Sequence, residues 1–216
     1  LAGLGTFGIA VPEAYGGAGM DYTALAVALE EIAAGDGATS TIISVNNCPV
    51  CAIFMAWANE QQKQQWLKPL ARGAMLGAFC LTEPHVGSQA DGLKTTAVRD
   101  GGDYVINGVK QFITSGKNGD VAIVMAVTDK AAGKRGISAF IVPTATPGYT
   151  VASLDELWDG IKTGSVRTAA QLRALDDDER ARVRGALDEL LEQRRSTGGL
   201  ELETAVKIAV GISPGA

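Results

Sequence analysis

Two short segments combine residue types suited to binding an anion and a flat ring. The first, Phe79-Cys-Leu-Thr-Glu-Pro-His-Val-Gly-Ser88, has the composition of a strand that its proline breaks into a glycine turn. Such a turn gathers free backbone N–H groups and the Ser88 hydroxyl, so we expect it to hold a pyrophosphate. The second, Lys110-Gln-Phe-Ile-Thr114, is expected to form a strand in which Phe112 and Thr114 share a face. A partly polar ring can stack on such a face.

The elements before these segments are expected to be helical. Asp21 is predicted to cap a helix that ends near Gly35. Residues 39–58 are apolar with several β-branched positions, so periodicity leaves helix and strand open, whereas their length favours helix. Pro49 should then kink this helix or mark its start. A third helix is expected over about 59–71.

The pattern changes at about residue 76 to short alternating runs. The strand candidates are 76–82, 94–99, 103–107, 110–114, 120–127 and 137–142. Asp100-Gly-Gly102 and Asn107-Gly108 separate neighbouring candidates and are predicted to form turns. We therefore expect an α+β chain in which helices precede an antiparallel β domain.

The composition shifts again near residue 156. Residues 157–216 hold seven arginines and two lysines, whereas residues 1–156 hold three arginines and seven lysines. An acidic start followed by apolar residues at helical spacing predicts a helix over about 178–195, and alternation predicts a strand over about 202–210. The expected division is 1–75 helical, 76–152 β, and 153–216 an atypical α/β tail.

Bulk properties exclude several classes of function. A net charge of −5 and a pI near 5.0 provide no basic field for nucleic acid. Cys48-Pro-Val-Cys51 is formally a C-x-x-C pair, but with a single histidine in the chain four zinc ligands are not readily gathered, so no metal site is expected. Three cysteines suggest a reducing compartment. We find no apolar run of membrane-span length and expect a cytoplasmic protein.

Two further stretches extend the pattern, Ile9-Ala-Val-Pro-Glu-Ala-Tyr-Gly-Gly-Ala-Gly19 and Glu60-Gln-Gln-Lys-Gln-Gln-Trp-Leu-Lys-Pro-Leu70. With the two segments above, they resemble the acyl-CoA dehydrogenases, from Leu1 to about Val151. The resemblance covers part of the N-terminal helical domain and most of the middle β domain. It implies a flavoprotein of fatty acid metabolism that uses FAD for α,β-dehydrogenation of acyl-CoA thioesters. It further implies electron-transfer flavoprotein as the electron acceptor and a homo-oligomer.

The resemblance assigns cofactor contacts in the first segment by position. The backbone of Phe79, Leu81 and Thr82 would face the pyrimidine edge of the flavin, with the Thr82 hydroxyl as an added partner. Gly87 and Ser88 would bind the pyrophosphate. Ser88 would also lie near the acyl-CoA substrate.

In the second segment, Phe112 stands where many members have tryptophan, and either aromatic can stack on the flavin. Ile113 would belong to the same cofactor site, and Thr114 would offer its hydroxyl near flavin N5. Read without the resemblance, Phe112 is ordinary core and the threonines are ordinary strand residues. His85 is expected to have no catalytic role, and Glu83 is expected to accept backbone N–H bonds rather than act as the base.

No catalytic residue is assigned. The family's base is a glutamate of a C-terminal helical bundle, which also contributes arginines and glutamines around the adenosine, and nothing in this sequence matches it. We therefore expect a truncated or recombined, catalytically incomplete form. One alternative is a non-catalytic flavin-binding or interaction remnant. Another is a fusion, because residues 157–216 weakly resemble the end of methyltransferases that use S-adenosylmethionine, although no glycine-rich strand–turn–helix is present.

Overall fold

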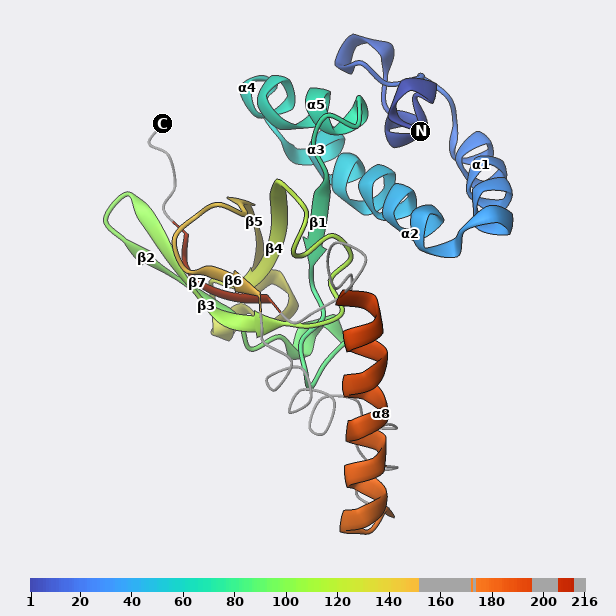
Figure 1. Ribbon diagram of the computed structural model, residues 1–216. Coiled ribbons are helices and arrows are strands. Elements are labelled where there is room, and N and C mark those ends of the chain that lie inside the picture. The colour runs from blue at the N-terminus through green and yellow to red at the C-terminus, as the bar shows by residue number, and fades with distance from the viewer. Residues whose placement is uncertain (152–171, 173, 196–205, 212–216) are drawn as a thin grey trace.

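The structure, a computed structural model, describes residues 1–151, 172, 174–195 and 206–211. Helices from the first half of the chain pack at one end of a sheet, and one long helix projects away from both (Figure 1). Helices followed by a β domain are what the sequence predicts, and the α+β class is confirmed.

The chain begins with three short 3₁₀ turns, η1 Ala2–Leu4, η2 Thr6–Gly8 and η3 Glu13–Tyr15, followed by α1 Tyr22–Gly35. Asp21 caps α1 as predicted, because its carboxylate accepts a hydrogen bond from the Ala24 N–H at 2.9 Å.

The apolar segment after α1 is helical with a kink. It comprises α2 Gly37–Val45, the π-helical turn η4 Asn46–Cys51 and α3 Ala52–Trp57. The kink lies at Cys48, whose backbone is extended (φ −146°, ψ 112°), directly before Pro49. This confirms the helical interpretation and the effect of the proline.

The expectation that no apolar run reaches the length of a membrane span is wrong for this segment. Gly37–Trp57 is long and apolar enough, at a mean hydropathy of 1.3, to match a membrane span by length and composition. In the structure Ile43, Val50 and Phe54 are buried inside the protein. Of the 18-residue window with this hydropathy, 39% is buried inside the protein.

The third predicted helix is also present, as α4 Glu60–Gln62, the π-helical turn η5 Lys63–Leu67 and α5 Lys68–Ala71. Asn59 and Gln62 form a reciprocal capping box at its start, with bonds of 2.8 and 3.0 Å.

Seven strands form one sheet in the order β1-β4-β2-β3-β7-β6, with β5 paired to β4. They are β1 Gly77–Cys80, β2 Thr96–Asp100, β3 Asp103–Lys110, β4 Val121–Val127, β5 Ile137–Pro143, β6 Tyr149–Val151 and β7 Val206–Gly211. Two 3₁₀ segments, η6 Ala90–Gly92 and η7 Lys130–Gly136, lie in the connections. Most pairs are antiparallel as expected, but β1 and β2 run parallel to β4, so the sheet is mixed.

The predicted hairpin at Asn107-Gly108 is wrong, because β3 passes through both residues without a turn. Gly108 is instead required by packing. A Cβ at this position would overlap the side chain of Thr95. The glycine turn between β2 and β3 is confirmed, with Gly101 at a φ of 61°.

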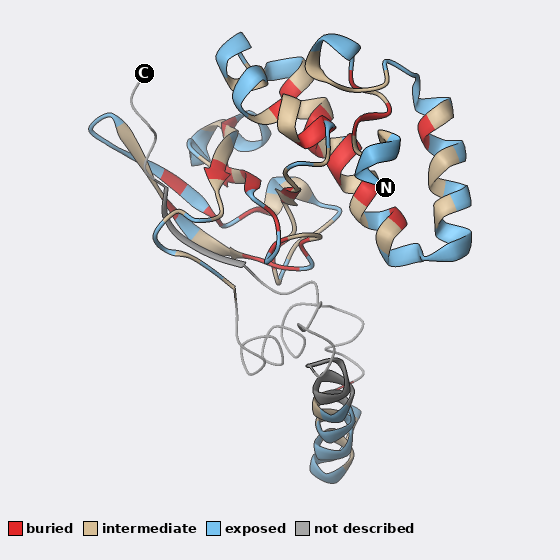
Figure 2. Ribbon diagram, turned by 45° about the horizontal axis from the view of Figure 1, so that its top comes forward, coloured by how far each residue is buried: buried red, intermediate tan, exposed pale blue. Residues whose placement is uncertain are grey.

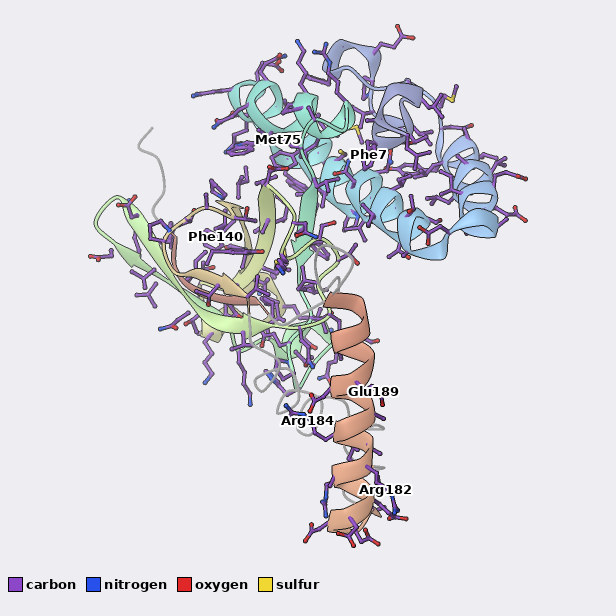
Figure 3. The ribbon with its side chains drawn as sticks, in the orientation of Figure 1. Phe7, Met75, Phe140, Arg182, Arg184 and Glu189 are labelled. Carbon is purple, nitrogen blue, oxygen red and sulfur yellow. The ribbon has the colours of Figure 1, made fainter. Side chains whose placement is uncertain are left out.

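The two tail elements appear close to their predicted positions. α8 spans Asp177–Arg195 and starts with a bond of 2.7 Å from the Glu179 N–H to the Asp176 carboxylate. Arg182 and Glu189 extend from it into solvent (Figure 3). Of the predicted strand 202–210, residues 202–205 lie outside the described part, and β7 inserts between β3 and β6.

Buried residues lie in both the helices and the sheet (Figure 2). They form two clusters on opposite faces of β4. Val121 and Ile123 pack against the helices, whereas Ala122 and Val124 face the interior of the curled sheet. Phe140 of β5 lies within the curl (Figure 3), and its ring is 5.1 Å from that of Tyr104. Alternate residues of β4 thus contribute to both clusters, one against the helices and one inside the curled sheet.

A buried side chain, Asn46 of η4, connects the helices to the sheet. Its amide nitrogen donates to the carbonyl oxygens of Phe7 at 2.9 Å and Leu70 at 3.1 Å, and its oxygen accepts from the Gly77 N–H at 3.1 Å. The start of β1 is therefore fixed to two separate helical segments.

Candidate functional site

The two segments singled out in the sequence lie side by side. The Gln111 N–H donates to the Thr82 carbonyl oxygen at 2.8 Å, and Lys110 Nζ donates to the Leu81 carbonyl oxygen at 3.0 Å. The end of β1 is thereby joined to the end of β3, and the residues that follow each strand come together in one place.

A buried ion pair holds this junction. Lys110 Nζ lies 2.8 Å from Glu83 Oε1, and the two side chains are 0% and 2% exposed. Burial raises the pKa of Glu83, but the hydrogen bonds from Lys110 and from backbone N–H groups outweigh burial and leave this pKa lowered. Burial lowers the pKa of Lys110, and Glu83 opposes that shift.

Glu83 also accepts bonds from the Lys94 N–H at 2.7 Å and the Thr95 N–H at 3.0 Å. It thus fixes both ends of the loop between β1 and β2. The prediction that Glu83 is a loop carboxylate accepting backbone N–H groups is confirmed.

The turn after Glu83 presents unused donors. Glu83 and Val86 bond to each other through their backbones at 2.9 and 3.1 Å, which turns the chain outward. Within the described part of the chain, the N–H groups of Gly87 and Ser88 have no hydrogen-bond acceptor, and the Ser88 hydroxyl has no partner. Ser88 is exposed. Adjacent free N–H groups beside a hydroxyl can bind an anion.

Thr82 faces this turn. A Cβ built on Gly87 would meet a single atom within 4 Å, the methyl carbon of Thr82 at 3.8 Å. The Thr82 hydroxyl makes no hydrogen bond to any described residue. Protein packing therefore does not require glycine at position 87, and the space beside it is open.

The prediction of a strand over 110–114 is wrong. β3 ends at Lys110, and Phe112 and Ser115 adopt left-handed backbone conformations with φ of 57° and 60°. Side chains with a Cβ rarely adopt this conformation, and two of them close together end extended structure. The alternation that was expected to place Phe112 and Thr114 on one face is absent.

The loop nevertheless exposes the Phe112 ring. Phe112 is 47% exposed, whereas Ile113 is 2% exposed and packs in the sheet core. The Ile113 carbonyl accepts from the Gly116 N–H at 3.0 Å, which closes the loop. Ile113 thus anchors the loop from within, and Phe112 is presented outward, so the alternative that Phe112 is ordinary core is excluded.

The edge of β1 lies next to this ring-bearing loop. Among the described strands, β1 pairs with β4 alone. The Gly77 N–H and the Leu81 carbonyl are bonded to side chains on the other edge. Because alternate residues direct their backbone groups to the same edge, Phe79 presents its N–H and C=O there. Its side chain packs with the helical cluster.

Profiles of two consecutive domains match the sequence. The acyl-CoA dehydrogenase N-terminal domain matches residues 1–74, and the acyl-CoA dehydrogenase middle domain matches residues 78–168. The chain belongs to the acyl-CoA dehydrogenase family. The match continues past Val151, where the resemblance was expected to end.

Two curated relatives of this acyl-CoA dehydrogenase family chain show the extent of the similarity. The human mitochondrial short-chain specific acyl-CoA dehydrogenase is 42% identical over 156 residues, which are 72% of this chain and 38% of the relative. A Bacillus subtilis acyl-CoA dehydrogenase is 46% identical over 147 residues, or 68% of this chain and 39% of the relative. The chain therefore spans well under half the length of these relatives.

Solved structures give the same result for the fold. Butyryl-CoA dehydrogenase from Megasphaera elsdenii matches with a TM-score of 0.66 at 39% identity, over 70% of this chain and 41% of that one. A glutaryl-CoA dehydrogenase from Mycobacterium smegmatis, solved in complex with FADH2, matches with a TM-score of 0.65 at 40% identity, over 70% and 38%. The acyl-CoA dehydrogenase fold is shown for the helices and the β domain.

Sequence reasoning missed Lys110 and Gln111 as site residues. Gln111 is fully buried, and both polar atoms of its amide lack hydrogen-bond partners among the described residues. A lysine at the end of an apolar strand is a recognisable signal, because such a side chain, once buried, needs a carboxylate. Glu83 is that carboxylate.

Beneath the site, Cys80 of β1 is buried in the sheet core. Burial raises the pKa of its thiol to about 12, despite the opposing charge of Lys110. Burial also raises the pKa of Tyr149, whose hydroxyl donates to the Gly116 carbonyl at 2.9 Å. Neither group is suited to proton transfer near neutral pH.

Proposed function

We propose that this chain forms one wall of the FAD site of an acyl-CoA dehydrogenase, an enzyme that converts acyl-CoA thioesters to 2-enoyl-CoA. The observation that carries the proposal is the convergence of three features. They are an exposed aromatic ring on a left-handed backbone at Phe112, the open edge of β1, and a turn with free N–H groups at Gly87 and Ser88.

The residues fit a flavin dinucleotide. Phe112 offers the ring for stacking, and its left-handed backbone is a strained conformation of the kind that occurs at ligand sites. Phe79 and Thr82 offer backbone groups and a hydroxyl to the polar edge of the flavin ring. Gly87 and Ser88 offer N–H groups and a hydroxyl to the pyrophosphate. The side chain of Ile113 faces the core, so this residue acts through its backbone and as the anchor of Phe112.

The residues of this chain would orient the bound cofactor and support the groups that contact it. The Glu83–Lys110 pair fixes the Thr82 loop against the Phe112 loop, so ring plane and hydroxyl are held before any ligand arrives. Bound FAD would supply the acceptor for the hydride that leaves the β carbon of the thioester. In this proposal Ser88 also contacts the acyl-CoA, and Thr114 lies beside the reactive end of the ring.

The base that removes the α proton lies, by resemblance, in a helical bundle beyond the domains matched here. Electron-transfer flavoprotein as acceptor, a homo-oligomeric assembly and a cytoplasmic location are further parts of the proposal. The acceptor and the assembly rest on the resemblance, whereas the location rests on the three cysteines, which fit a reducing compartment.

The first test separates ligand binding from folding. Gly87→Ala should leave the free energy of unfolding unchanged within about 1 kcal/mol, because a methyl group has room there. It should weaken FAD binding, measured by isothermal titration, because the methyl group occupies the space left for the pyrophosphate. Gly102→Ala, in the hairpin between β2 and β3 with nothing within 4 Å, is the matched control. Equal FAD affinity in the wild type and Gly87→Ala would contradict the proposal.

The second test concerns activity. We propose that this chain by itself binds FAD weakly and does not oxidise acyl-CoA, because loss of a general base typically costs ~100- to 10,000-fold in rate. Reduction of an electron acceptor with short-, medium- and branched-chain acyl-CoAs measures this. Turnover that disappears on a Glu→Gln change in the tail would instead locate a base there.

A further inference from the structure

The tail strand β7 lies between β3 and β6 and pairs with both (Figure 1). Ile208 of β7 is opposite Gly108 on one side and opposite Tyr149 on the other. Both pairings are antiparallel and reach Val206, which lies opposite Lys110 at the end of β3. A strand with two neighbours directs its backbone N–H and C=O groups alternately to each of them. In this sheet β6 is therefore joined to β3 through β7.

The two strands beside β7 are held by contacts that do not involve it. β3 pairs with β2 from Asp103 to Asn107. Tyr149 of β6 packs against the sheet core, and its hydroxyl donates to the Gly116 carbonyl oxygen, in the loop after β3, at 2.9 Å. The strand position between β3 and β6 is thus formed by the β domain itself. Without β7 it would present two unpaired strand edges, which are a template for another strand.

The strand that fills this position lies outside the part of the chain that matches the family. The two family domains match residues 1–74 and 78–168, whereas β7 spans Val206–Gly211. The sequence of β7, Val-Lys-Ile-Ala-Val-Gly, places a β-branched residue at every second position, a pattern that favours a strand. A segment beyond the family match therefore completes a sheet that belongs to the family match.

We propose that the strand position between β3 and β6 is a peptide-binding site of the β-augmentation type, which residues 206–211 of the same chain occupy. Backbone hydrogen bonds on both sides supply the affinity, and the ligand that fits is an extended segment with β-branched residues at alternate positions. Because covalent attachment raises the effective concentration of β7 at its site, a free peptide of the same sequence should compete poorly. The inference does not rest on the proposed function, since it uses no contact with FAD or acyl-CoA.

Amide hydrogen exchange in the full chain tests whether the site is occupied. Successive N–H groups of β3 point alternately to β2 and to β7, and in the wild type both sets should be protected. Ile208→Pro removes an N–H group and does not fit a central strand. The set directed to β7 should then exchange roughly three- to tenfold faster, the effect of one lost hydrogen bond, while the set directed to β2 stays protected. Ile208→Val, which keeps the N–H group and the branched side chain, is the matched control.

The wild type alone can contradict this proposal. Fast exchange of every second amide of β3 in the wild type would show that β7 does not occupy the site. If Ile208→Pro also loses the protection directed to β2, Ala209→Pro, which keeps Ile208 opposite Gly108 and Tyr149, replaces it in the comparison.

A labelled peptide with the sequence of residues 204–214 tests recognition by the same site. It should bind the proline variant saturably and restore the slow exchange of β3, and it should bind the wild type at least about tenfold more weakly, because β7 is already in place. The same peptide with proline at position 208 is the control. Equal binding of both peptides, or binding of neither, would overturn the peptide-binding role.

The concentration dependence of hydrogen exchange distinguishes β7 of the same chain from β7 of a second copy. Protection of the amides directed to β7 should be constant over about a hundredfold range of protein concentration, because pairing within one chain does not depend on mass action. Protection that falls on dilution would show that a second copy supplies the strand, and would overturn the assignment to the same chain.

Discussion

The ammonium group of Lys110 lies 2.8 Å from the carboxylate of Glu83, and almost no solvent reaches either group. Lys110 ends β3 and Glu83 follows β1, so this contact helps to hold the Phe112 segment beside the Thr82 segment. The bonds from Lys110 to Leu81 and from Gln111 to Thr82 act in the same place. A buried pair of this kind contributes little net stability relative to apolar residues. Removing one partner, however, leaves the other charge buried without compensation, which is strongly destabilising.

Lys110→Met should therefore destabilise the fold by about 3–5 kcal/mol, because it leaves the Glu83 carboxylate buried without its cation. Urea unfolding followed by circular dichroism measures the change. Lys134→Met is the matched control, since that lysine is 80% exposed and its pair with Asp91 should contribute about 0–1 kcal/mol. A similar loss of unfolding free energy in both variants would show that the buried pair contributes no more to stability than the exposed pair.

The stability contributed by Glu83 should depend on pH. Its pKa in the folded chain is lowered from the ordinary 4.5, so this contribution is complete above about pH 4.5 and is lost as the pH falls through the folded-state pKa. The difference in unfolding free energy between wild type and Glu83→Gln should thus be constant near neutrality and shrink in acid. Unfolding at intervals from pH 7 to pH 3 tests this, with the exposed Glu31→Gln as control. A difference that grows toward acid would contradict it.

Replacing Phe112 should separate stability from binding. Phe112→Gly removes a left-handed conformation that costs a residue with a side chain about 1–2 kcal/mol, against about 0.5–1 kcal/mol for the flexibility of glycine. We expect unchanged or slightly raised stability together with a clear loss of FAD affinity. Ile113→Ala, one residue away and buried, should cost about 2–5 kcal/mol. A strongly destabilised Phe112→Gly would show that the ring is structural.

The three cysteines should differ sharply in reactivity. Cys48 is exposed, whereas Cys51 and Cys80 are buried and burial raises the pKa of each thiol to about 12. Since the thiolate is the reactive form, one thiol should react quickly with a disulfide reagent in the native protein, and all three after unfolding. Cys48→Ser should abolish the fast phase. Two fast thiols would show that Cys51 or Cys80 becomes accessible in the native protein.

Local patterns were sufficient to predict most elements. The Asp21 cap, the helix over 59–71 and the β2–β3 turn depend on nearby residues, and each was found as predicted. The errors at Asn107-Gly108 and at 110–114 share another cause. Gly108 is required by Thr95, which lies directly before β2, and the left-handed Phe112 is followed by Ile113, which is buried in the sheet core. Neither constraint is visible in a short stretch of sequence.

The cofactor roles assigned to the site residues stay predictions, and the local geometry of these residues could not be predicted from the sequence. Thr82, Gly87, Ser88 and Phe112 do lie around one junction, although the strand that was to align Phe112 with Thr114 is a loop. The ion pair at this junction joins residues 27 apart in the chain, and sequence spacing carries no information about such a pair.

The three bonds of Asn46 have a mechanical consequence. The short connection between α5 and β1 is where one would look for a hinge between the helices and the sheet. The Asn46 amide spans that connection from Leu70 to Gly77, so bending there would break buried hydrogen bonds to both sides at once. The helices and β1 should consequently rotate as one rigid body, and a bound ring on the edge of β1 would move with them.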